Sequence, residues 1–191
     1  MLARLGGSLL IAAAGLACLA GWIALSGGVV GLALRNSPPP APGEWVVAAT
    51  IAMLGVGAVA VSIGGARPFE DPARAGFAVL GLGSLSLASA SVLPFAGILV
   101  DSIAILLLLV GGLVMSALGW LLVGAALAGV PGRQRVVGIV LLTGFLGPVL
   151  TVGNGPSVIT GPLFLLLPIG LAGAGVLIFR TGSSDRGLRA T

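Results

Sequence analysis

The stretch SIAILLLLVGGLVMSALGWLLVGAALAG, residues 102–129, contains no charged side chain. Asp101 precedes it, and the polar turn PGRQR follows it closely at residues 131–135. A helix needs about 20 mostly apolar residues to cross the roughly 30 Å hydrocarbon core of a bilayer. The stretch exceeds this length, so it predicts a membrane-spanning helix.

The composition of the whole chain agrees with that prediction. Hydrophobic residues make up 58% of the 191 residues and charged residues only 7%, whereas a soluble domain has roughly 25% charged residues. A soluble protein of this size must cover its surface with polar groups, and this chain has too few. We expect an all-α, polytopic transmembrane bundle that forms one domain over residues 1–180, followed by a short polar tail over residues 181–191.

Five further apolar segments accompany the first, and charge, Pro or Gly separates them. They cover residues 5–34, 45–65, 73–93, 136–150 and 162–179. The chain therefore has room for six spans joined by short turns, and we expect no soluble domain.

The nine arginines test this division. With six spans, Arg35 lies on one side of the membrane and the other eight lie on the opposite side, together with both termini. Short cytoplasmic loops retain Arg and Lys, so both termini are expected in the cytoplasm. The eight are Arg4, Arg67, Arg74, Arg133, Arg135, Arg180, Arg186 and Arg189.

The basic balance of the chain does not indicate nucleic-acid binding. That function needs a basic groove with stacking aromatics, and these arginines are scattered among turns. The absence of Lys and His suits the coding bias of a GC-rich prokaryotic genome. Together with the six apolar segments, this predicts a multi-pass protein of a prokaryotic cell membrane. The first apolar segment is too long for a cleaved signal peptide, and the single Cys18 is expected to be a small helical residue.

The stretch RPFEDPAR, residues 67–74, holds four of the chain's fourteen charges. It is expected to form the cytoplasmic turn between the second and third spans, with Asp71 capping the next helix and Pro72 in its first turn. A second interpretation makes Arg67, Glu70, Asp71 and Arg74 a contact surface for a cytoplasmic partner.

Small residues at helical spacing predict where spans pack together. Spans associate in lipid by close backbone approach, which small side chains permit. Serine hydroxyls on such a face could also line a polar path. The expected packing residues are Ala13, Ala17 and Gly21 in the first span, and Gly81, Ser84, Ala88 and Ser91 in the third. The fourth span offers Gly112 with Ser116 and Gly124 with Ala128.

Familiar catalytic and metal-binding patterns are missing from the sequence. Without histidine the chain can form no bis-His haem site, no His-based zinc site and no Ser-His-Asp triad. It also has no P-loop and no dinucleotide-binding fingerprint. We therefore expect no enzyme activity, no cofactor and no metal site.

The stretch GPVLTVGNGPSVITGP, residues 147–162, is the most irregular in the sequence. It is interpreted either as a plain outer turn or as a partly re-entrant segment, which is tolerated at membrane depth where it lines a cavity. In the second case Asn154, Ser157 and Thr160 would contact a ligand. Asp101, at the outer end of the fourth span, is a further ligand-binding candidate, although a capping role explains it as well.

Two functions fit these patterns. The scarcity of charge within the spans favours a non-catalytic structural or accessory subunit, associated with a larger membrane partner or with further copies of itself. The irregular outer stretch favours a transport component that binds a neutral small molecule. In size and span count the chain resembles the substrate-binding subunits of vitamin-uptake transporters. Ala13 and Ala17 match the Ala-x-x-x-Ala motif of their first helix, a spacing that also serves helix packing.

Overall fold

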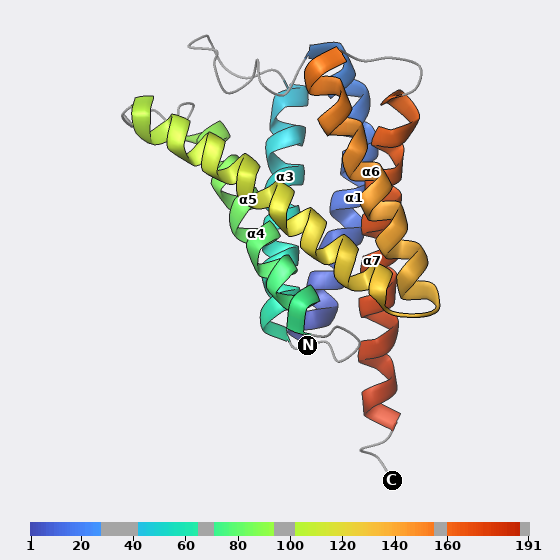
Figure 1. Ribbon diagram of the computed structural model, residues 1–191. Coiled ribbons are helices and arrows are strands. Elements are labelled where there is room, and N and C mark those ends of the chain that lie inside the picture. Colours follow the sequence, from blue (N-terminus) through green and yellow to red (C-terminus); the bar gives the residue numbers. More distant parts are fainter. Residues whose placement is uncertain (28–41, 65–70, 94–101, 155–159, 188–191) are drawn as a thin grey trace.

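The computed structural model describes residues 1–27, 42–64, 71–93, 102–154 and 160–187. These residues form six α-helices and contain no strand (Figure 1), which confirms the predicted all-helical class. The helices are α1 (Leu2–Gly27), α3 (Pro42–Gly64), α4 (Asp71–Val92), α5 (Ser102–Gly129), α6 (Arg133–Asn154) and α7 (Thr160–Gly187).

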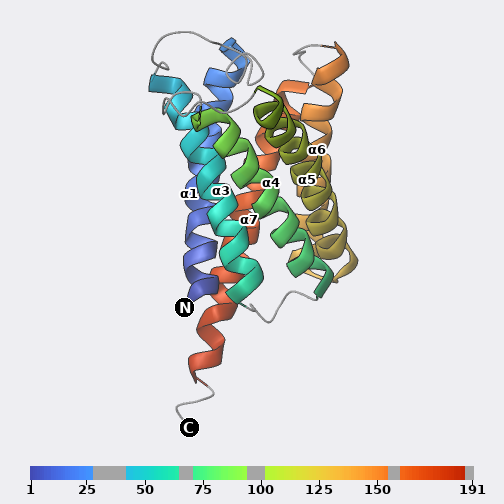
Figure 2. The same cartoon turned by 90° about the vertical axis from the view of Figure 1, so that its left-hand side faces the viewer.

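The six helices form a ring. Each one packs against the next along the chain, and α7 returns to pack against α1. Successive helices alternate in direction, so α1 begins and α7 ends at the same end of the bundle (Figures 1 and 2). We call this the terminal end; α4 and α6 also begin there.

Three of the helices are long and apolar enough to cross a membrane within the part of the chain that the structure describes. They correspond to Trp45–Gly64, Asp71–Val92 and Ile103–Gly129. Two shorter apolar helical stretches, Leu2–Cys18 and Leu166–Arg180, belong to α1 and α7. The three long helices indicate that the protein associates with a membrane.

Among the side chains that the structure describes, the largest fully buried ones lie nearer the terminal end. Large, fully buried side chains come from α1, α3, α4, α5, α6 and α7: Leu10, Val61, Phe77, Leu80, Val123, Leu127, Leu141 and Ile178. By contrast, none of the nine α5 residues from Ile103 to Gly111 is buried. The first part of α5 therefore adds no fully buried residue to the bundle.

Glycines allow the backbones of neighbouring helices to approach closely. A Cβ atom on Gly83 of α4 would lie 2.5 Å from the backbone nitrogen of Ser116 in α5. A Cβ on Gly175 of α7 would lie 2.7 Å from the carbonyl oxygen of Gly7 in α1. Such contacts leave no room for a side chain, and close backbone packing is what holds helices together in lipid.

Several boundaries differ from those expected. Helix α7 continues to Gly187, so most of the polar tail expected over residues 181–191 is helical. Helix α6 continues to Asn154 through part of the stretch that looked irregular in the sequence. Helix α1 begins at Leu2 and is described to Gly27, and the remainder of the first apolar segment lies outside the described residues.

Candidate functional site

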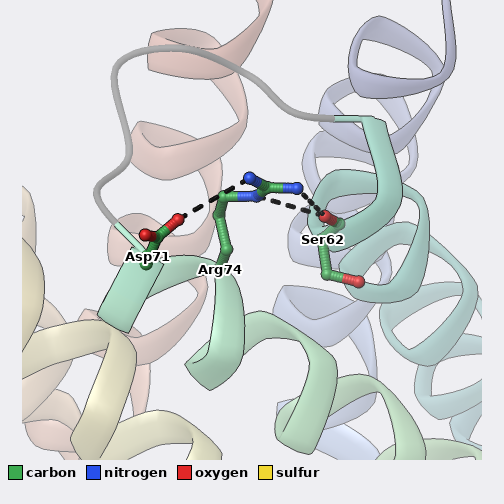
Figure 3. Close-up of polar contacts among 3 residues, drawn as sticks. All are labelled: Ser62, Asp71 and Arg74. Atoms are coloured by element: carbon green, nitrogen blue, oxygen red, sulfur yellow. Dashed lines mark hydrogen bonds and ion pairs between the residues drawn. The ribbon is translucent and has the colours of Figure 1, made fainter.

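The most specific polar arrangement joins the end of α3 to the start of α4 at the terminal end of the bundle (Figure 3). Arg74 donates from Nη2 and Nε to the carbonyl oxygen of Ser62, at 3.2 Å and 3.4 Å. Its Nη1 lies 3.8 Å from Oδ1 of Asp71, one turn earlier on α4. One guanidinium therefore bridges two successive helices.

The position of Ser62 explains why an arginine is favourable there. Ser62 lies in the last turn of α3, where carbonyl groups lack a partner within the helix. Those carbonyls form the negative end of the helix dipole, which attracts a cation. Arg74 supplies both the hydrogen-bond donors and the positive charge, so it acts as a cap for α3 provided by α4.

Asp71 contributes less to this arrangement. Its side chain is 99% exposed, whereas that of Arg74 is 40% exposed, and exposed ion pairs of this kind contribute little to stability. Of the four residues expected to meet a partner, Arg74 is engaged within the chain, Asp71 faces solvent, and Arg67 and Glu70 lie outside the described residues.

The described arginine side chains all belong to the terminal end. Arg4 is in the first turn of α1, and Arg133 and Arg135 are in the first turn of α6. Arg180 is on α7 and directly follows Phe179, which contacts Arg4. The Arg4 guanidinium lies 5.8 Å from the centre of the Phe179 ring, a cation–π distance that fixes α1 against α7. Asp71 is the only acidic residue among those whose side chains the structure describes.

The structure places the expected packing residues as follows. Ala13 is fully buried and Ala17 is half-buried, and the surroundings of Gly21 lie outside the described side chains. On α4, Gly81, Ser84 and Ala88 are buried and Ser91 is half-buried. The Ser91 hydroxyl donates to the carbonyl oxygen of Leu87 at 2.9 Å, so it serves its own helix, as serines in helices often do.

Close contacts on α5 involve residues whose spacing is visible in the sequence. Gly112 and Ser116 are buried where α5 meets Gly83 of α4, and Gly124 lies against Leu142 of α6. The Ser116 hydroxyl is buried without a hydrogen-bond partner among the described groups. The sequence predicts that these residues pack but not which helix each one meets.

The expected ligand-binding residues are only partly described. Asn154 is the last residue of α6 and Thr160 the first of α7, so the two stand at paired helix ends opposite the terminal end. Ser157 and Asp101 lie outside the described residues. The described residues include no group of three or more His, Cys, Asp or Glu side chains close enough to share a metal ion.

Sequence reasoning missed the partner of Arg74. Ser62 is twelve residues earlier and contributes a backbone carbonyl, which no side-chain pattern reveals. The one available signal was the position of Ser62 near the end of the second span, where unpaired carbonyls are expected.

Comparison with known proteins gives no relative: no protein-family model, no curated protein and no solved structure matches the chain.

Proposed function

We propose that the chain is a six-span integral protein of a prokaryotic cell membrane, with both termini in the cytoplasm. Helices α1, α6 and α7 have 26, 22 and 28 residues. At about 1.5 Å per residue, α1 and the apolar parts of α6 and α7 are long enough to cross the roughly 30 Å of hydrocarbon. The alternating directions of the six helices and the arginines at the terminal end support this topology.

Within that membrane we propose a non-catalytic structural or accessory role, in which the chain packs against a larger membrane partner. The observation that carries this proposal is the exposed face of α5. Only 17% of the most apolar 18-residue stretch of α5 is buried inside the bundle, against 44% of the corresponding stretches of α3 and α4. The large exposed side chains on this helix are Ile103, Leu106, Leu107, Val110, Leu113, Val114, Leu118, Leu121 and Leu122.

Lipid can cover any apolar helix face. Helix α5 differs from α3 and α4, however, because a smaller share of its residues is buried within the chain's own bundle. Its first part adds no buried residue, and a Cβ on the exposed Gly111 would meet nothing within 4 Å. A glycine on an exposed helix face costs helix stability without helping to pack the chain's own bundle. Close approach of a second protein explains such a residue.

Photo-crosslinking in native membranes tests this role. A benzophenone side chain at Leu107 or Val114 on α5 should give one protein adduct of defined size. Matched probes at Val56 on α3 and Ile169 on α7, which are 47% and 57% exposed, should give lipid adducts only. Protein adducts from all four positions, or from none, would contradict a docking face on α5.

A transport component is the alternative, supported by the polar residues Asn154 and Thr160 at the paired ends of α6 and α7. It requires a neutral small molecule bound at that end of the bundle. A molecule that copurifies with the chain and is lost in Asn154→Ala would favour transport over the accessory role.

A further inference from the structure

Two serine hydroxyls are buried where α4 meets α5, and they lack the hydrogen bonds that other helical hydroxyls of the chain make. Ser84 on α4 is 1% exposed and Ser116 on α5 is 9% exposed. The Ser116 hydroxyl has no partner among the described groups, and the structure shows no hydrogen bond from the Ser84 hydroxyl to a described group. The hydroxyls that donate to a carbonyl oxygen four residues earlier belong to Thr50, Ser86, Ser91 and Thr143. Leaving a buried hydroxyl unpaired is costly, so this pair requires an explanation.

The two serines lie at the same level of the bundle. Gly83 precedes Ser84, and a Cβ on Gly83 would lie 2.5 Å from the backbone nitrogen of Ser116 and 2.7 Å from its hydroxyl oxygen. Ser84 is four residues after Leu80 and Ser116 is four residues before Trp120, so each serine shares a helix face with a residue of the apolar core. Both serines are also near the middle of their helices. They therefore place two polar groups beside the core, midway along the bundle.

The cover over α5 changes at the level of Ser116. Leu113 and Trp120 are seven residues, or about two helical turns, apart, so they lie on the same side of α5. Trp120 is 7% exposed, whereas Leu113 is 50% exposed. Figure 1 shows the reason, because the start of α5 leans away from the end of α6. A molecule that reaches Leu113 from the side of the bundle is therefore about one helical turn from Ser116.

The surroundings of the two serines restrict what can bind there. Residues 75–132 contain a single charged side chain, Asp101, which lies fifteen residues before Ser116. A charged ligand would therefore lack a nearby counterion, and an unpaired charge is expensive to bury. Leu113 and Trp120 offer apolar and aromatic contacts, and small-molecule sites typically combine such walls with a few polar groups that fix the orientation of the ligand. These features fit an uncharged molecule with an apolar body and one hydroxyl, carbonyl or amide group.

We propose that Ser84 and Ser116 form the polar end of a binding site for such a molecule, whose apolar body lies against Leu113 and Trp120. A hydrogen-bonding group on the ligand supplies the partners that the two hydroxyls lack, which an acyl chain of a lipid cannot do. The site goes beyond the accessory role and requires no partner at the exposed face of α5.

Photoaffinity labelling of the purified chain in phosphatidylcholine nanodiscs tests this site. The probe is a photoreactive octanol with a diazirine ring in its alkyl chain, and mass spectrometry should place its adducts on α4 and α5 near Ser84 and Ser116. Unlabelled octanol should compete with this labelling, whereas octane, which has the same chain length and no hydroxyl, should not. Equal competition by octanol and octane would overturn the role of the two hydroxyls.

The double variant Ser84→Ala/Ser116→Ala removes both hydroxyls and little volume. Loss of one hydrogen bond weakens binding about fivefold, so the double variant should bind the probe at least about fivefold more weakly. Its Tm should not fall, because the hydroxyls removed are buried without partners, and a loss of labelling is then not due to unfolding. Ser91→Ala is the matched control on α4, since the Ser91 hydroxyl already bonds to the Leu87 carbonyl, and it should leave labelling unchanged. Labelling of the double variant at the wild-type level, or adducts confined to the exposed side chains of α5, would overturn the site.

Discussion

Replacing Gly83 by alanine is the sharpest test of the seam between α4 and α5. The added Cβ would lie 2.5 Å from the backbone nitrogen of Ser116, 2.7 Å from its hydroxyl oxygen and 2.9 Å from the carbonyl oxygen of Gly112. Two of these atoms belong to the backbone of a helix and cannot rotate away. The helices must therefore move apart.

The expected cost follows from two opposing effects. Overpacking by one carbon costs about 1–3 kcal/mol, and exchanging Gly for Ala within a helix returns up to about 1 kcal/mol. Gly111, one residue before Gly112, is the matched control because a Cβ there meets nothing within 4 Å. Gly111→Ala should receive the gain without the cost. Because the gain is common to both variants, they should differ by the overpacking cost alone, about 1–3 kcal/mol.

Thermal unfolding of both variants in one detergent measures this difference. For a chain of this size 1 kcal/mol corresponds to about 2–4 °C in Tm, so Gly83→Ala should melt about 2–12 °C below Gly111→Ala. Equal Tm values for the two variants would refute the close approach of α4 and α5 at Gly83. Gly111→Ala melting lower than the wild type would contradict its exposed position.

Two further changes test other contacts. Arg74→Gln removes the charged donors to the Ser62 carbonyl and should destabilise the detergent-solubilised protein by about 1 kcal/mol, whereas Asp71→Asn should leave its Tm unchanged; equal effects of the two would argue against the arginine cap. Ala13→Leu should lower Tm by more than Ala17→Leu, because Ala13 is fully buried and Ala17 only half-buried; the reverse order would place the first seam on another face of α1.

The positions of the helices were largely predictable because each apolar segment is bounded by charge, Pro or Gly. The predicted start of the third segment, residue 73, is two residues from the start of α4 at Asp71. The predicted end of the fourth, Gly129, coincides with the end of α5. The length of an apolar segment predicts a spanning helix well, because unpaired backbone groups are costly in lipid and a helix pairs them within the segment.

The ends of α6 and α7 were not predictable in the same way. The polar sequence RTGSSDRG, residues 180–187, carries no apolar pattern, yet it extends α7 to Gly187. A helix that has already formed gains one hydrogen bond for each residue added, so polar residues can continue it. Gly and Pro near the end of α6 likewise suggested irregular backbone, but a helix in a bundle accommodates them.

Contacts between helices were the least predictable feature. Small residues at helical spacing identified faces such as Gly112 with Ser116, but the spacing is the same whichever helix lies opposite. The pairing of Gly83 with Ser116 and the closure of the ring through Gly7 and Gly175 depend on how all six helices are arranged. The hydrogen bonds from Arg74 to the Ser62 carbonyl likewise depend on how α3 and α4 meet, which the sequence does not specify.

The topology of six spans with both termini in the cytoplasm is tested most directly by labelling single cysteines in a Cys18→Ala background. Ser37→Cys and Ser157→Cys should react with a membrane-impermeant maleimide in intact cells. Glu70→Cys and Ser183→Cys should react only in inverted membrane vesicles. Labelling of Ser37→Cys and Ser183→Cys from the same side would contradict the proposed topology.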